Sequence, residues 1–253
     1  MTSDKFTLSP SGVLIATDFR ENLLIDRYDP VFSSMRAGKI KHLQSANSED
    51  AVIWNVFRSL RQISPDAWLP ALWQQAFPSI AFSPAERTEV NLWQNITPPP
   101  PLLADGDEGP SEIDVIIETP TYVWFIEAKY RSDISARTKT RPDRDQVLRN
   151  IDVGSYYAGV RQFLFSLLIA SKSRSPEGAE RVRQYSDPAI PRARLEKHRQ
   201  DALKNLIAIS QITWRSLADV LEHAAKSASR EDERAYAVRA VNWLTERGIL
   251  KTS

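Results

Sequence analysis

The chain has 253 residues, with 33 Lys and Arg against 32 Asp and Glu, 42% hydrophobic residues, three histidines and no cysteine. This composition predicts a globular protein with one well-buried core and an appended element, and the lack of cysteine excludes thiol nucleophiles, disulfides and Cys-ligated metal centres. No apolar run is long enough for a signal peptide or a membrane span, so we expect no membrane association and a cytoplasmic location.

The first part of the chain has helical spacing of its apolar residues. Residues 47–62 begin with Asn47, a favourable N-cap, and place Ile53, Val56 and Leu60 on one face, which predicts an amphipathic helix. Residues 66–82 contain aromatic side chains interrupted by prolines, which predicts short helices or turns packed on the core.

A β-hairpin is predicted in the middle of the chain. The apolar segments 113–118 and 122–130 are rich in β-branched and aromatic residues and are separated by a break that contains Pro120. Helices are expected afterwards, over 143–170 with Gly154 as a kink or boundary. We then expect an exposed basic loop over 172–204 that leads into a helix, and two amphipathic helices over 214–225 and 231–247.

Three charged residues interrupt the apolar hairpin: Asp114 in its first segment, and Glu127 and Lys129 in its second. Side chains alternate between the faces of a strand, so Glu127 and Lys129 share a face, and antiparallel pairing brings Asp114 opposite or diagonal to Glu127. Two carboxylates in an apolar sheet repel each other, and a divalent cation removes that cost. Mg²⁺ needs only one or two carboxylates besides water and phosphate oxygens, so the set predicts metal-dependent phosphodiester hydrolysis assisted by Lys129.

With Glu127, Ala128 and Lys129 in this position, the chain resembles the PD-(D/E)xK nuclease superfamily over roughly residues 45–160. The resemblance implies that Asp114 and Glu127 bind Mg²⁺, with Mn²⁺ as a substitute, and that Lys129 is the catalytic lysine. It also implies a site role for Glu49, in SEDAVIWNVF, as a further metal ligand and for Gln146, in RDQVLRN, on the helix after the lysine strand. The chain departs from the pattern before Asp114, where Ile113 stands and the nearest proline is Pro110.

The resemblance implies an α/β fold with a restriction-endonuclease-like mixed central sheet flanked by helices and a C-terminal helical region. The expected nuclease core covers 1–170, including the N-terminal helices. Residues 171–253 form a basic loop and a helical extension that packs on the same domain.

Each of these residues also has a structural interpretation. Glu127 and Lys129 match an ordinary ion pair on a solvated strand face. Glu49 matches a first-turn acid favoured by the helix dipole, and Gln146 matches a polar surface residue.

The loop after the lysine strand is basic, with six Lys and Arg against three acids between Arg131 and Arg149. We expect phosphate contacts from Arg131, Lys139, Arg141 and Arg144, because such contacts hold a nucleic-acid backbone without reading its sequence. The alternative is a charged loop that is only solvated.

Other chemistries lack support, because the three histidines are scattered and no glycine-rich nucleotide loop occurs. The expected function is a Mg²⁺-dependent nuclease that binds nucleic acid and cuts DNA as an endonuclease in restriction, defence or repair. Many members of the superfamily dimerise to cut two strands, so a homodimer is part of the expectation. The alternatives are a non-catalytic module on the same fold that binds nucleic acid or a partner, and a structural protein.

Overall fold

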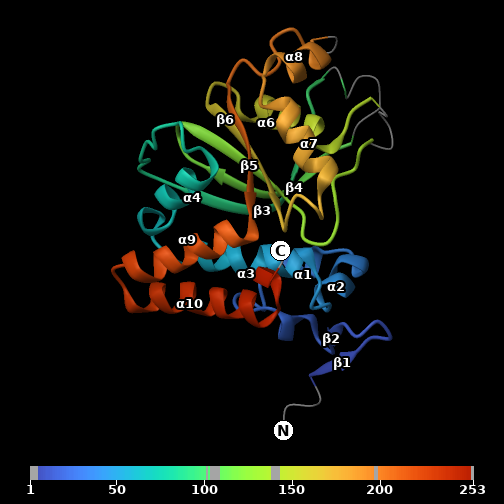
Figure 1. Cartoon of the computed structure of the whole chain (residues 1–253), viewed down its shortest axis with the longest axis vertical. Helices are drawn as coiled ribbons and strands as arrows, with labels where there is room; N and C mark the ends of the chain where they lie inside the picture. The colour runs from blue at the N-terminus through green and yellow to red at the C-terminus, as the bar shows by residue number, and fades with distance from the viewer. Residues whose placement is uncertain (1–4, 101, 103–108, 138–142, 197–198, 252–253) are drawn as a thin grey trace. The chain divides into compact units, whose positions relative to one another are not determined.

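The computed structural model describes residues 5–100, 102, 109–137, 143–196 and 199–251 (Figure 1). The chain divides into two compact units. The terminal unit comprises residues 1–71 and 217–253, and the sheet unit comprises residues 72–216. This division separates the chain at other residues than the boundary near 170 that the sequence suggests.

A five-stranded mixed sheet forms the centre of the sheet unit. Its strand order is β3-β4-β5-β6-β7, in which β3, β4 and β5 pair antiparallel and β5, β6 and β7 pair parallel. The predicted hairpin is therefore confirmed as β4 and β5. The strands are β3 (Glu89–Ile96), β4 (Ser111–Glu118), β5 (Tyr122–Ala128), β6 (Gln162–Ile169) and β7 (Leu206–Thr213).

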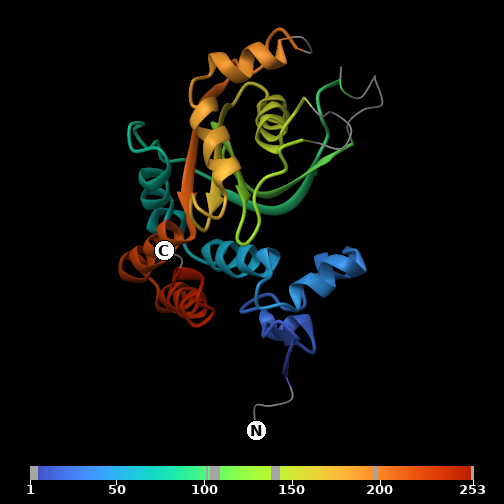
Figure 2. The same ribbon diagram turned by 45° about the vertical axis from the view of Figure 1, so that its right-hand side comes forward.

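Helices cover both faces of this sheet (Figures 1 and 2). Phe125 and Phe163 point toward Gly154 of α6, whereas Trp124 of the same strand β5 points the other way and contacts Trp73 of α4 with 6.0 Å between ring centroids. Because side chains alternate between the two faces along β5, α6 and α4 pack on opposite faces of the sheet. The helices that contribute to this unit are α4 (Leu69–Ala76), α6 (Gln146–Ala158), α7 (Pro176–Tyr185) and α8 (Ala189–Leu195).

The predicted helix over 143–170 is wrong in its second half. Helix α6 stops at Ala158, where Gly159 takes a φ of 62°, and residues 162–169 then form the buried strand β6. An apolar run of this length is compatible with a buried strand or a buried helix, and periodicity does not separate the two. Gly154 is not a helix boundary, because it lies inside α6.

Two further predictions need correction. The segment 172–204 contains the helices α7 and α8 instead of a long exposed loop. The N-cap of α3 is Ser48 rather than Asn47, because the Ser48 hydroxyl accepts the Ala51 N–H at 3.1 Å. Strands β3 and β7 were not predicted.

The terminal unit contains a two-stranded sheet, several helices and the end of the chain. Its first half comprises β1 (Phe6–Leu8), β2 (Leu14–Ala16), η1 (Phe19–Asn22), α1 (Val31–Ser34), α2 (Ala37–Leu43), α3 (Glu49–Arg61) and η2 (Pro65–Ala67). Its second half comprises α9 (Trp214–Ser227), of which the part from Leu217 belongs to this unit, α10 (Glu231–Glu246) and η3 (Ile249–Lys251). The predicted C-terminal helices are thus confirmed. Across the described residues, no helix combines the length and the apolar character needed to cross a membrane.

Candidate functional site

The two predicted carboxylates lie next to the end of the β4–β5 ladder. Val115 and Ile126 form the last pair of this ladder, and Asp114 and Glu127 are the next residues on the two strands. The Asp114 Oδ2 atom accepts the backbone N–H of Ala128 at 2.8 Å. The Asp114 carboxylate is therefore tied to the backbone of the residue that follows Glu127.

An irregularity in the edge strand β3 lies beside Asp114. The β3–β4 ladder pairs Leu92 with Val115 and Gln94 with Ile113, and it skips Trp93 and Asp114 between them. Trp93 has a φ of 54°, which is a strained conformation for a bulky residue and accompanies a local distortion of the strand. The sequence offers no glycine or proline at this point that would have revealed it.

The Glu127 carboxylate is buried and has three side-chain donors. Its residue is only 2% exposed. Its Oε1 atom accepts from Lys129 Nζ at 2.7 Å and from Gln146 Nε2 at 2.5 Å, and its Oε2 atom accepts from Asn150 Nδ2 at 2.7 Å. Burying a carboxylate is costly unless it is paired and hydrogen-bonded, and these contacts meet both conditions.

Gln146 and Asn150 lie one turn apart on α6 and face Glu127 together. The Ser135 N–H donates to Gln146 Oε1 at 3.2 Å, which leaves the amide nitrogen of Gln146 directed at Glu127. Gln146 thus contacts Glu127 directly, and its role in a catalytic site stays a prediction. Asn150 was missed, although its spacing of four residues from Gln146 on one helix was the available signal.

Lys129 follows β5 directly and is held by its backbone on two sides. Its N–H donates to Leu168 O at 2.7 Å, and its carbonyl accepts Trp214 Nε1 at 3.1 Å. The residue is 8% exposed, so the alternative of a solvated strand face does not hold for Lys129 or Glu127. The shared face that alternation predicted for these two residues is confirmed by their direct contact.

The remaining predicted metal ligand, Glu49, begins α3 in the terminal unit. Its role therefore stays a prediction. Two acidic residues, Glu49 and Asp50, occupy the first turn of this helix, where the helix dipole favours negative charge.

The structure gives different outcomes for the four residues predicted to contact phosphate. Lys139 and Arg141 lie outside the described residues. Arg131 is exposed, with its guanidinium 5.5 Å from the ring centroid of Tyr130. Arg144 is only 1% exposed, and its Nη2 atom lies 3.0 Å from Asp152 Oδ2, so this burial does not suit the phosphate contact predicted for it.

The donor set fits a hard divalent cation better than zinc. Asp114 and Glu127 offer carboxylate oxygens, which Mg²⁺ and Mn²⁺ favour, whereas zinc sites use His and Cys. Within the described ranges, no group of three or more His, Cys, Asp and Glu side chains is arranged to hold a metal. A cation at this hairpin would therefore depend on the two carboxylates together with water and substrate oxygens. It would also compete with the Lys129 ammonium for Glu127.

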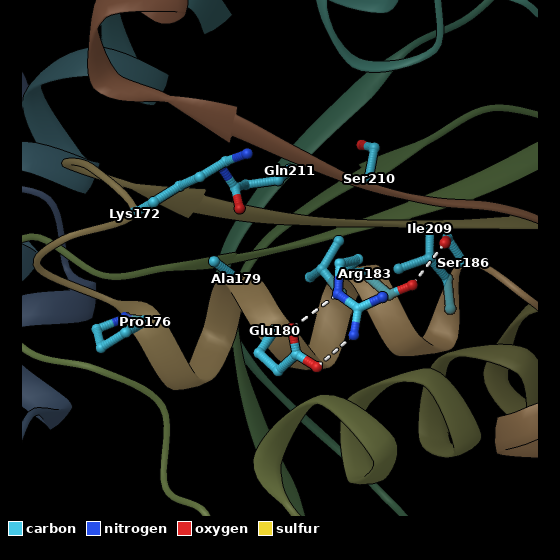
Figure 3. A pocket seen from close by; sticks show the side chains of 10 residues that line it. Lys172, Pro176, Ala179, Glu180, Arg183, Ser186, Ile209, Ser210 and Gln211 are labelled. Atoms are coloured by element: carbon cyan, nitrogen blue, oxygen red, sulfur yellow. Dashed lines mark hydrogen bonds and ion pairs between the residues drawn. The ribbon is translucent and has the colours of Figure 1, made fainter.

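A separate groove of about 600 Å³ lies between α7 and β7 (Figure 3). Its lining includes Lys172, Ser210 and Gln211, and on α7 the residues Glu180 and Arg183 form an ion pair of 2.6 Å. None of the predicted site residues contributes to this lining. The groove and the carboxylate–lysine site are therefore different features of the sheet unit.

Comparisons of the chain with protein-family models, with curated proteins and with solved structures each give no match.

Proposed function

We propose that this chain is a metal-dependent phosphodiesterase, a nuclease that cuts DNA internally with Mg²⁺ as its cofactor. The observation that carries this proposal is the juxtaposition at the end of the hairpin. Asp114 and Glu127 follow the last pair of the β4–β5 ladder on their two strands, and the Lys129 ammonium lies 2.7 Å from the Glu127 carboxylate. Two carboxylates that can bind a divalent ion, with an ammonium beside them, suit the hydrolysis of a phosphodiester by such an ion.

Each residue has a defined task in this proposal. Asp114 and Glu127 hold the ion, which when bound polarises the phosphodiester and acidifies water. Lys129 orients the attacking water and offsets the negative charge that develops at phosphorus. Gln146 and Asn150 keep the Glu127 carboxylate in one orientation.

A restriction-endonuclease-like fold belongs to the same proposal. Its support is a mixed sheet in which Asp114 of β4 lies beside the distorted point of β3, and Glu127-Ala128-Lys129 stands at the end of β5. The helix that follows carries Gln146 as its first residue. DNA as the substrate, and a role in restriction, defence or repair, rest on the resemblance to the PD-(D/E)xK nucleases.

The experiment is cleavage of plasmid and oligonucleotide DNA with Mg²⁺ or Mn²⁺. Lys129→Ala is expected to lower the cleavage rate at least about a hundredfold, since it removes a charge aimed at the transition state. The variant should still fold and bind DNA, and EDTA should abolish cleavage by the wild type. Lys172→Ala, an exposed lysine in the groove, is the matched control and should cut like the wild type.

Equal cleavage by the wild type and Lys129→Ala would refute the assigned role of the lysine. DNA binding that needs no divalent ion, with no cleavage in any condition, would instead favour the non-catalytic module.

A further inference from the structure

Asp145, the residue before α6, is buried and has partners on several elements. Its Oδ1 atom caps the helix by accepting the Leu148 N–H at 2.8 Å. Its Oδ2 atom accepts the Tyr185 hydroxyl at 2.5 Å and Arg194 Nη1 at 3.3 Å. The side chain is 1% exposed. One carboxylate thus does two separate jobs, one with each oxygen.

The partners of Oδ2 come from the two helices that follow in the chain. Tyr185 is the last residue of α7, which also brings Arg181 Nε to 3.6 Å from Oδ2, and Arg194 belongs to α8. Arg194 also donates to the Tyr185 hydroxyl and to the carbonyl of Asp143. Burial raises the pKa of Tyr185, and the hydrogen bond to Asp145 raises it further, so the phenol stays a donor at neutral pH. Asp145 therefore ties the start of α6 to α7 and α8.

The start of α6 is also where the site is held. Gln146 is the next residue after Asp145, and Asn150 lies one turn further on. Their amide nitrogens reach Glu127 at 2.5 Å and 2.7 Å. Hydrogen bonds weaken steeply outside a narrow range of distance and angle, so a small shift of this helix end would break both contacts.

We propose that Asp145 is a positioning residue, which anchors the N-terminus of α6 to Tyr185 and Arg194 and so keeps Gln146 and Asn150 on the Glu127 carboxylate. The anchoring is a property of the fold, and only its effect on cleavage rests on the proposed function. Positional errors of about 1 Å remote from the chemistry can slow a reaction about a hundredfold.

The chain supplies a matched control on the same helix. Asp152 is also buried, at 2% exposed, and pairs with Arg144 Nη2 and Arg199 Nη2, each at 3.0 Å. Arg144 lies directly before Asp145, whereas Arg199 lies outside α6, so Arg199→Gln removes one partner of Asp152 and leaves the contact at the start of α6 in place. A buried ion pair that only stabilises the fold would give the same result at the two aspartates, whereas the anchor is specific to Asp145.

The variants are chosen to remove the anchor and spare the cap. Tyr185→Phe deletes one hydroxyl, and Asp145→Ser keeps an N-cap residue but removes the second oxygen. The readout is the exchange rate of the Gln146 and Asn150 side-chain amide protons, followed by NMR. We expect exchange at least about fivefold faster in both variants, the factor that one lost hydrogen bond of typical strength provides. Arg199→Gln should lower the thermal midpoint and leave the amide exchange of Gln146 at the wild-type rate.

Cleavage kinetics form the second arm. Both anchor variants should lower kcat and raise the Mg²⁺ concentration for half-maximal rate, with the KM for DNA unchanged. Wild-type exchange rates in Tyr185→Phe would overturn the proposal even if Asp145→Ser does not fold. So would an equal acceleration in Arg199→Gln. A wild type that cuts no DNA would remove the proposed function, and the exchange rates would still decide whether the anchor exists.

Discussion

Gly154→Ala is expected to lower the free energy of unfolding by about 2 kcal/mol, in spite of the higher helix propensity of alanine. A Cβ atom at this position would lie 2.2 Å from Phe163 Cζ and 2.9 Å from Phe125 Cδ2. Both rings are fully buried in the core between α6 and the sheet, so neither can move aside cheaply. Urea denaturation followed by circular dichroism gives the change in the free energy of unfolding.

Gly38→Ala is the matched control for this substitution. Gly38 lies in α2, and a Cβ atom there would meet nothing within 4 Å. The same change should therefore stabilise the chain, by about 0.5–1 kcal/mol, because alanine favours the helix. A Gly154→Ala variant as stable as the wild type would show that the packing of α6 on β5 and β6 is looser than described.

The second large effect concerns Glu127→Gln, which should lower Mg²⁺-dependent cleavage at least about a thousandfold. Glutamine has almost the same shape and keeps one oxygen acceptor, but it loses the charge that holds the ion. Because the shape is kept, α6 and the hairpin should stay in place, and the far-ultraviolet circular dichroism spectrum should not change. Initial rates on a supercoiled plasmid measure the loss.

Glu112→Gln is the control for the loss of a carboxylate in the same sheet. Glu112 is an exposed residue of β4, two positions before Asp114. This variant should cleave at the wild-type rate. A Glu127→Gln enzyme within tenfold of the wild type would exclude Glu127 as an essential ligand.

The hairpin and its charged residues could be predicted because the signal is local. Charges are rare in apolar strands, and alternation within β5 fixes that Glu127 and Lys129 share a face. The break of three residues between the two segments limits the register in which they can pair. Most of the allowed registers place Asp114 near Glu127. Gln146 was predicted only from the resemblance to the PD-(D/E)xK nucleases, which implies a Gln on the helix after the lysine strand.

The rest depended on contacts that are distant in sequence. Residues 162–169 have the same apolar character as a buried helix, and only their pairing with β5 and β7 makes them a strand. Arg144 has the same charge as the other basic residues of its loop, and the sequence alone does not show that it is buried and paired with Asp152. The distorted geometry of Trp93 also has no local cause, because no glycine marks it.

The central claim is that Asp114 and Glu127 together hold one divalent ion, and titration with Mn²⁺ followed by electron paramagnetic resonance tests it directly. The account predicts one saturable Mn²⁺ per wild-type chain, displaced by excess Mg²⁺, and a loss of that site in Asp114→Asn and in Glu127→Gln. A wild type that binds no Mn²⁺, or a site that survives both substitutions, would contradict it.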